Sequence, residues 1–162
     1  MRLAVYPDGE VVVTAPYFFG LRAIQHFFGK HIDWVRRKVE DSRGRTVIRI
    51  PRKDIPFLKK QALALAHERC AHFAALYGIS FGRISVRAQK TRWGSCSYKG
   101  DLSFNYRLAA LPARIADYIV VHELCHILEL NHSKAFWREV ARAIPEHKQI
   151  RAEMRELVML FY

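Results

Sequence analysis

Hydrophobic and polar positions in the first third of the chain predict a hairpin followed by a helix. Apolar residues over 3–5 and 10–14 flank the turn-forming Pro7-Asp8-Gly9, a pattern typical of two short strands. From residue 21 to residue 41, apolar side chains recur at three- and four-residue steps, as they do on one face of a helix. Gly29 weakens the middle of this pattern and favours a division of the helix there.

A linker, a long helix and a small sheet are predicted next. Residues 42–52 are polar and basic and are interpreted as a linker. A helical pattern then continues to residue 77, with Asp54 as a candidate N-cap and Gly78 as the residue that ends the helix. Residues 84–88 alternate as a strand, and two short segments around the Lys-Gly-Asp turn at 99–101 predict a hairpin.

Three helices are predicted in the last third. The first begins near Pro112, a residue tolerated in a first helical turn, and meets no breaker before Asn131. Ser133 is a candidate N-cap for a second helix over 134–143, and residues 150–160 form the last amphipathic helix. The 162 residues suffice for one domain. We divide it into a 1–45 N-terminal hairpin-and-helix layer and a 53–162 core.

Composition narrows the class of protein. Hydrophobic residues make up 51% of the chain, which fits a globular protein and excludes intrinsic disorder as its main description. There is no apolar run long enough to span a membrane and no signal-peptide pattern at the N-terminus, so no membrane partner is expected. The three cysteines are widely spaced, unlike a secreted disulfide framework, and this favours a cytoplasmic location.

The net charge is strongly positive. Twenty-seven Lys and Arg against fifteen Asp and Glu give a formal charge of +12, which favours acidic or polyanionic partners. Nucleic acid is one such partner. The basic residues are dispersed along the chain and not gathered into one tract, so the charge alone does not establish a nucleic-acid interface.

Candidate catalytic chemistry concentrates in the helix predicted from residue 112. Residues four apart on a helix differ by only about 40° in direction, so His122 and His126 face the same side. Glu123 follows the first histidine, where its carboxylate can reach a metal-bound water. This H-E-x-x-H arrangement is one in which two histidines bind zinc and the glutamate acts as general base. His132, after the turn-prone Asn131, offers a third nitrogen ligand.

Four segments complete the pattern. They are Arg92-Trp93-Gly94-Ser95-Cys96-Ser97, Asn105 with Leu108, Val120-Val121-His122-Glu123-Leu124-Cys125-His126, and Asn131-His132-Ser133-Lys134-Ala135-Phe136-Trp137. Together they resemble the YgjP-like, or DUF45, family, which is grouped with the SprT-like zinc metallopeptidases. The Pro-Asp-Gly hairpin and residues 32–38 resemble the N-terminal layer of that family. Compared with that family, the chain begins late in the usual first strand, which implies either a missing upstream piece or a misassigned start codon.

The resemblance implies an α+β, zincin-like fold, with a small mixed or antiparallel sheet packed beside an active-site helix that carries the HExxH motif. It implies Zn²⁺ held by His122, His126 and His132, with Glu123 as general base. Metzincins share the histidine spacing but place a glycine where this chain has Glu129, and they carry a methionine turn. A gluzincin pattern would instead take Glu139 as third ligand. We prefer His132, because it follows His126 closely and histidine competes well for zinc.

The segment Arg92-Trp93-Gly94-Ser95 is the candidate substrate-binding element. Its backbone amides, or a side chain such as Arg92 or Tyr106, are candidate donors to the oxyanion that develops during hydrolysis. The strand could also pair with an extended peptide; alternatively, Trp93 fills the core under the helix.

We therefore favour a zinc metallopeptidase that acts on a peptide or protein. Two alternatives stay open, namely a nucleic-acid-associated zinc protein with conditional or DNA-dependent proteolysis, and a zinc hydrolase of a small molecule or nucleotide. The sequence does not indicate the oligomeric state.

Overall fold

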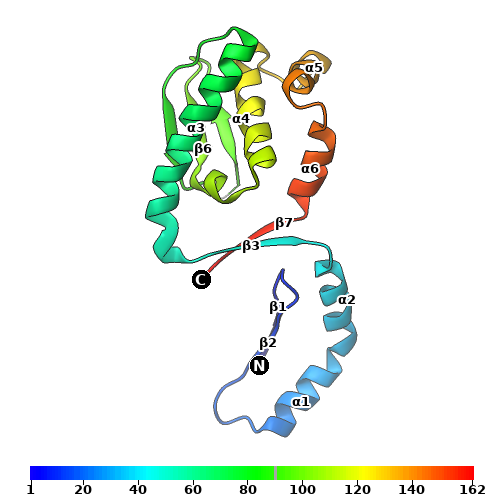
Figure 1. The fold of residues 1–162 in the computed structure, drawn as a ribbon. Coiled ribbons are helices and arrows are strands. Elements are labelled where there is room, and N and C mark those ends of the chain that lie inside the picture. The colour runs from blue at the N-terminus through cyan, green and yellow to red at the C-terminus, as the bar shows by residue number, and fades with distance from the viewer. Residues whose placement is uncertain (90) are drawn as a thin grey trace. The chain divides into compact units, whose positions relative to one another are not determined.

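The computed structural model describes residues 1–162 except Lys90 and divides into two compact units (Figure 1). One unit combines Met1–Arg49 with Glu156–Leu160, and the other combines Ile50–Arg155 with Phe161–Tyr162. The first unit thus includes a C-terminal segment that the sequence analysis assigned to the 53–162 core. No helix in the described part of the chain is both long and apolar enough to cross a membrane.

The first unit begins with the predicted hairpin. Strands β1 (Arg2–Val5) and β2 (Val11–Thr14) pair antiparallel, and Gly9 takes the positive φ of 84° that their turn requires. The predicted helix divides at His31 into α1 (Leu21–Lys30) and α2 (Ile32–Ser42), close to the division expected at Gly29. Apolar side chains reach the surface of this unit, where Tyr17, Phe18 and Leu21 are exposed.

Two expectations were wrong, and for the same reason. The predicted linker contains strand β3 (Thr46–Ile50), and the predicted last helix ends early as α6 (His147–Arg155), followed by strand β7 (Leu157–Phe161). The two strands pair with each other. A short apolar run such as 157–161 fits a helix or a strand equally well by periodicity. The partner strand, which is distant in sequence, decides between them by satisfying the backbone hydrogen bonds.

The second unit packs two helices against a mixed sheet of three strands. Helix α3 (Ile55–Tyr77) ends at Gly78, which has a φ of 65° as its predicted stop. The expected side-chain cap by Asp54 was wrong, because Asp54 precedes the helix without accepting a capping hydrogen bond. The sheet has the order β4 (Ile84–Arg87), β6 (Leu102–Asn105), β5 (Gly94–Cys96).

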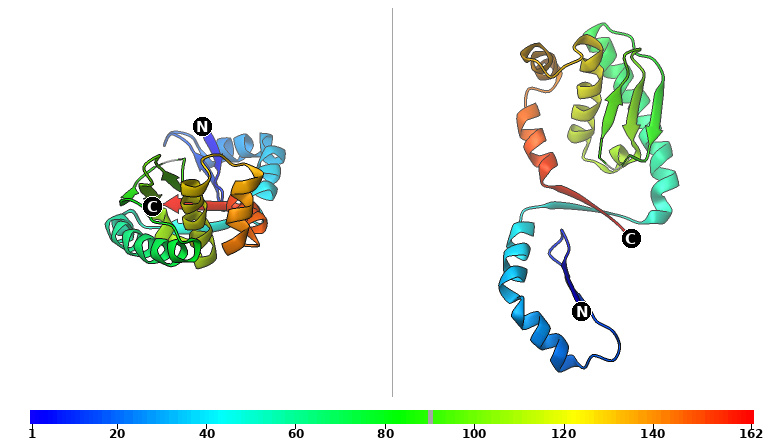
Figure 2. Two further views of the ribbon diagram at one scale, coloured as in Figure 1. Left: turned by 90° about the horizontal axis from the view of Figure 1, so that it is seen from above. Right: turned by 180° about the vertical axis from the view of Figure 1, so that it is seen from behind.

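The sheet is mixed because β6 pairs parallel with β4 and antiparallel with β5, as in the predicted hairpin. All four residues of β6 are buried, whereas β5 lies at an edge. Helices α3 and α4 (Ala113–Leu128) lie on one face of the sheet: in front of it in Figure 1 and behind it in the right-hand view of Figure 2. This two-layer arrangement brings α4 alongside the exposed edge strand.

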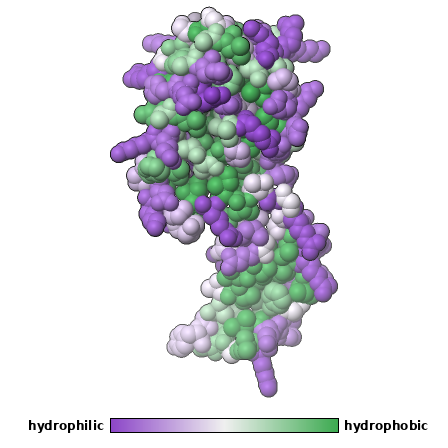
Figure 3. All heavy atoms as spheres, in the orientation of Figure 1, coloured by the Kyte–Doolittle hydropathy of each residue, from purple (hydrophilic) through white to green (hydrophobic). Residues whose placement is uncertain are grey.

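Two short 3₁₀ turns, Arg52–Asp54 and Tyr106–Ala110, and helices α5 (Lys134–Ala143) and α6 complete the second unit. Ser133 caps α5 as predicted, since its hydroxyl accepts a hydrogen bond from the Phe136 amide at 3.3 Å. On the face shown in Figure 3, hydrophilic side chains are spread over the surface and not collected in one patch. This agrees with the dispersed basic residues in the sequence.

Candidate active site

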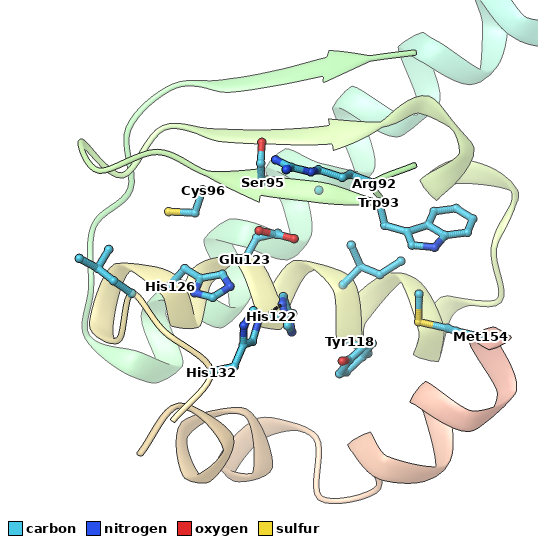
Figure 4. Close-up of a pocket in the computed structure, with 13 residues that line it drawn as sticks. Arg92, Trp93, Ser95, Cys96, Tyr118, His122, Glu123, His126, His132 and Met154 are labelled. Atoms are coloured by element: carbon cyan, nitrogen blue, oxygen red, sulfur yellow. Dashed lines mark hydrogen bonds between the residues drawn. The ribbon is translucent and has the colours of Figure 1, made fainter. Parts of the chain in front are cut away.

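Helix α4 and the loop that follows it bring three histidines together (Figure 4). His122 and His126 lie on one face of α4, and His132 comes from the loop before α5. One ligand atom from each lies within 4.8 Å of the others. The Nε2 atoms of His122 and His132 are 3.1 Å apart.

This donor set fits a zinc ion. Tetrahedral coordination with Zn–N bonds of about 2.0–2.1 Å places neighbouring nitrogens about 3.3 Å apart, close to the distance between His122 and His132. Two imidazole nitrogens that face each other this closely need a cation or a proton between their lone pairs. The Nδ1 atom of His126 lies 3.1 Å from the Glu129 carbonyl, which fixes that nitrogen as the donor and leaves Nε2 for a metal.

The environment of His122 and His132 favours the neutral imidazole, the form that binds metal. Burial, reinforced by the neighbouring histidines and Arg151, lowers the pKa of His122 to about 3. Burial and the same kinds of neighbour also lower the pKa of His132. His122 Nδ1 is buried and has no hydrogen-bond partner among the described residues.

Two aromatic residues of α5 support the histidines. Phe136 stacks on His126 with ring centroids 4.6 Å apart, and Trp137 stacks on His132 at 5.8 Å. Trp137 also stacks on His147 at 5.5 Å. His132 is itself exposed on a loop, and its ring contacts with Trp137, Phe136 and the other two histidines orient it.

Glu123 lies between α4 and strand β5 and is only 6% exposed (Figure 4). Burial raises the pKa of its carboxyl to about 7, while the charge of Arg92 acts in the opposite direction. Gly94 makes room for this side chain, because a Cβ there would lie 2.7 Å from Cγ, 2.8 Å from Oε1 and 2.9 Å from Cδ of Glu123. Any residue larger than glycine would therefore require the Glu123 side chain or the strand to shift, so the Trp-Gly-Ser segment and the HExxH helix are in close contact here.

A cavity of about 510 Å³ contains the predicted site residues. It is lined by Arg92, Trp93, Gly94 and Ser95 together with Glu123 and the three histidines. Trp93 is half-buried on the cavity wall and thus does not simply fill the core. Tyr106 is buried and does not line the cavity. Glu139 lies outside the histidine cluster and pairs with Arg142 at 2.6 Å.

Several residues of the cavity wall were not predicted from the sequence. Tyr118 and Met154 line the cavity, from α4 and α6. Tyr118 precedes His122 by four residues, so helical periodicity could have identified it as sharing the ligand face. No local pattern could have identified Met154, because α6 is distant in sequence from the rest of the cavity.

Asn105 holds the loop before β5. Its side-chain amide donates hydrogen bonds to the carbonyls of Gln89 at 2.6 Å and Arg92 at 3.0 Å, and its oxygen accepts one from the Arg107 amide at 3.2 Å. The residue is 1% exposed. It therefore fixes the point at which the chain enters the edge strand beside Glu123.

Two solved structures resemble part of this chain. The crystal structure of the metallopeptidase zymogen of Pyrococcus abyssi abylysin aligns with a TM-score of 0.51 and 26% identity, over 59% of this chain and 99% of that chain. The metallopeptidase zymogen of Methanocaldococcus jannaschii jannalysin shares the fold, with a TM-score of 0.51 and 20% identity over 56% of this chain and 94% of that one. A search of curated protein sequences gave no match.

A family model gives the assignment. The model described as the YgjP-like metallopeptidase domain matches residues 49–157, which span the sheet, α3, α4 and the histidine cluster. Together with the similarity to abylysin, it supports a metallopeptidase. Since the match covers more than half of the 162 residues, the chain belongs to the YgjP-like family.

Proposed function

We propose that the chain is a zinc-dependent metallopeptidase of the zincin-like type, in which His122, His126 and His132 hold Zn²⁺ and Glu123 is the general base. The observation that carries this proposal is the position of Glu123. It is buried between the histidine-bearing face of α4 and the edge strand β5, in one cavity with all three histidines. This carboxylate forms no ion pair among the described residues, although the charge of Arg92 favours its ionised form; a catalytic role explains its burial.

Each residue has a defined task in peptide hydrolysis. Zinc, when bound, supplies Lewis-acid chemistry that polarises a carbonyl and acidifies water. Glu123 accepts the proton of the attacking water at its carboxylate and delivers it to the leaving amine. A pKa of about 7 suits a group that must both accept and release a proton near neutral pH.

The edge strand supplies the means to orient a peptide. Strand β5 pairs only with β6 among the described strands, so its outer edge can pair with an extended substrate. The backbone amides of residues 93–95 and the exposed Arg92 border the same cavity, and they are the candidate donors to the developing oxyanion. The buried position of Tyr106 removes it from this group.

The decisive experiment is hydrolysis of a mixed peptide library by the wild type and by Glu123→Gln. The variant is expected to keep one zinc per chain, measured by inductively coupled plasma mass spectrometry, and to lose about 10²- to 10⁴-fold in kcat/KM. Glu68→Gln, an exposed change on α3, is the matched control and should hydrolyse peptides normally. Undiminished hydrolysis by Glu123→Gln rules out this mechanism, and hydrolysis of nucleotides but not peptides rules out the peptidase.

A further inference from the structure

Arg151 of helix α6 places a positive charge beside the candidate active site. Its guanidinium carbon lies 4.4 Å from the centroid of the Trp137 ring. Trp137 in turn contacts the ring of His132 at 5.8 Å and that of His122 at 5.9 Å. The charge of Arg151 also helps to lower the pKa of both histidines. Arg151 is thus separated by one aromatic ring from two of the three candidate metal ligands.

The helical position of Arg151 turns it toward the cavity. His147 precedes it by four residues and also stacks on Trp137, with ring centroids 5.5 Å apart. Met154 follows it by three residues and lines the cavity. Residues three and four apart share one face of a helix, so Arg151 lies between the Trp137 contact and the cavity wall. The wall residue Tyr118 also lies within the electrostatic influence of Arg151.

The hydrogen-bonding groups of Arg151 have no partner in the described part of the chain. Its exposed side chain forms no ion pair and no hydrogen bond there, and its one close contact is with Trp137. By contrast, Arg114 pairs with Glu153 of α6. A guanidinium held over an aromatic ring keeps N–H donors at its edge, and two of them match the two oxygens of a carboxylate. Arg151 is therefore oriented by Trp137 and has donors available for a ligand.

The charge of the cavity wall also favours a carboxylate as that ligand. Arg92 lines the cavity from the side of β5. Glu123 is the one acidic residue among the described residues that line the cavity. A substrate carboxylate is attracted by both Arg92 and Arg151, whereas a lysine side chain is repelled by both.

The direction of β5 predicts which part of a substrate meets Arg151. The strand runs from Gly94 to Cys96. A peptide paired antiparallel with it, the more stable arrangement per residue, runs from the Cys96 end of the cavity toward the Trp93 end. Met154 of α6 lies at the Trp93 end (Figure 4). The part of the peptide that follows the scissile bond therefore passes closest to α6.

We propose that Arg151 binds a carboxylate of the substrate on the C-terminal side of the scissile bond. This carboxylate is an Asp or Glu side chain or the free C-terminus of a peptide, because both present the same pair of oxygens. The inference rests on the proposed peptidase function and deepens it by naming the substrate class. That class is peptides with a carboxylate within two residues after the cleaved bond.

The test measures binding separately from hydrolysis. Full-length, zinc-loaded Glu123→Gln protein is titrated with fluorescent peptides of otherwise neutral sequence that carry one Glu, Gln or Lys at successive positions. Each peptide is made with a free and with an amidated C-terminus, and fluorescence anisotropy gives the dissociation constants. A peptide with a correctly placed carboxylate is expected to bind about 10- to 100-fold more tightly than its neutral counterpart, and the Lys peptide most weakly. The preference should decrease as salt is added.

Variants of Arg151 in this background separate ligand binding from packing. Arg151→Glu should reverse the order, so that Lys peptides bind more tightly than Glu peptides, which loss of a packing contact alone would not produce. Arg151→Lys should keep part of the preference, because lysine retains the charge but not the paired donors. Arg151 is exposed, so zinc content should stay unchanged in both variants. Lys60→Glu is the matched control, because it changes the net charge equally at an exposed position of α3 that does not line the cavity.

The two sources of the carboxylate give different results. A preference for Glu that persists after amidation identifies a side chain, and one that amidation removes identifies the C-terminus of the peptide. Mass spectrometry of wild-type digests gives the cleavage position to which the preferred position is compared.

Three results overturn the inference. They are equal affinity for all peptides, a carboxylate preference that survives Arg151→Glu, and a preference located on the N-terminal side of the cleaved bond. Hydrolysis without a carboxylate preference refutes this inference alone. A preference that depends on Arg151, in a protein whose wild type hydrolyses no peptide, sustains the binding site and refutes the proposed peptidase function.

Discussion

Replacement of Gly94 by alanine tests whether strand β5 and Glu123 depend on each other. The backbone of Gly94 does not have a positive φ, so alanine meets no conformational strain there and the effect comes from side-chain space alone. The new methyl carbon would lie 2.7 Å from Cγ of Glu123, whereas carbon atoms in contact are normally about 3.5–4.0 Å apart. Glu123 is buried, so either its carboxylate or the strand must move by about 1 Å.

A displacement of this size has a predictable cost. A misplacement of about 1 Å in a catalytic group lowers the rate by about 100-fold, which corresponds to about 2.7 kcal/mol in the activation free energy. Overpacking should lower the free energy of unfolding by about 1–3 kcal/mol. We expect kcat/KM for a peptide to fall about 100-fold while zinc content stays unchanged, because the three histidines do not depend on Gly94.

The matched control is Gly29→Ala. Gly29 lies in α1, where an added Cβ would have no neighbour within 4 Å, and alanine is the better helix former by roughly 0.5–1 kcal/mol. This variant should be at least as stable as the wild type and equally active. An unchanged kcat/KM in Gly94→Ala would refute the steric argument. Loss of zinc would show that the substitution displaces the histidines and not Glu123 alone.

Three further predictions follow from the same contacts. His132→Ala should lose bound zinc in metal analysis whereas Glu139→Ala keeps it, and the reverse result would identify Glu139 as the third ligand. Asn105→Ala should lower the free energy of unfolding by about 1–3 kcal/mol in urea denaturation, because the part-buried carbonyls of Gln89 and Arg92 lose their donor; a change below about 0.5 kcal/mol would contradict this. Burial raises the pKa of Glu123 from 4.5 to about 7, so the unfolded chain releases this proton at lower pH than the folded one. The metal-free wild type should therefore lose stability relative to Glu123→Gln as pH rises from about 4.5 to about 7, by on the order of 3 kcal/mol, with no further loss above; parallel stability profiles of the two proteins would refute it.

Local patterns predicted the elements whose structure depends on neighbouring residues. Gly78 ends α3 and Ser133 caps α5 because each acts within one turn of its own position. The i, i+4 spacing of His122 and His126 places them on one face of a single helix. Asp54 occupies the N-cap position of α3 but accepts no capping hydrogen bond, because its backbone (φ −86°, ψ −8°) is not in the extended conformation that a capping residue needs.

Long-range contacts decided the elements that local patterns could not. Strand β7 exists because β3 provides a partner about a hundred residues away, and no periodicity within 157–161 contains that information. Tyr106 was a candidate oxyanion donor and Trp93 a candidate substrate-binding residue. Tertiary packing buries Tyr106 and leaves Trp93 on the cavity wall.

The sequence by itself predicted the candidate ligands, the candidate general base and the helix that carries them, since these predictions follow from residue identity and helical geometry. Only the tertiary structure decided that the exposed His132 turns toward α4 against Trp137, and that Gly94 admits the Glu123 side chain. The physical reason is the sequence separation over which each interaction acts. Hydrogen bonding within a helix acts over a few residues, whereas burial and close packing join residues that the chain keeps far apart.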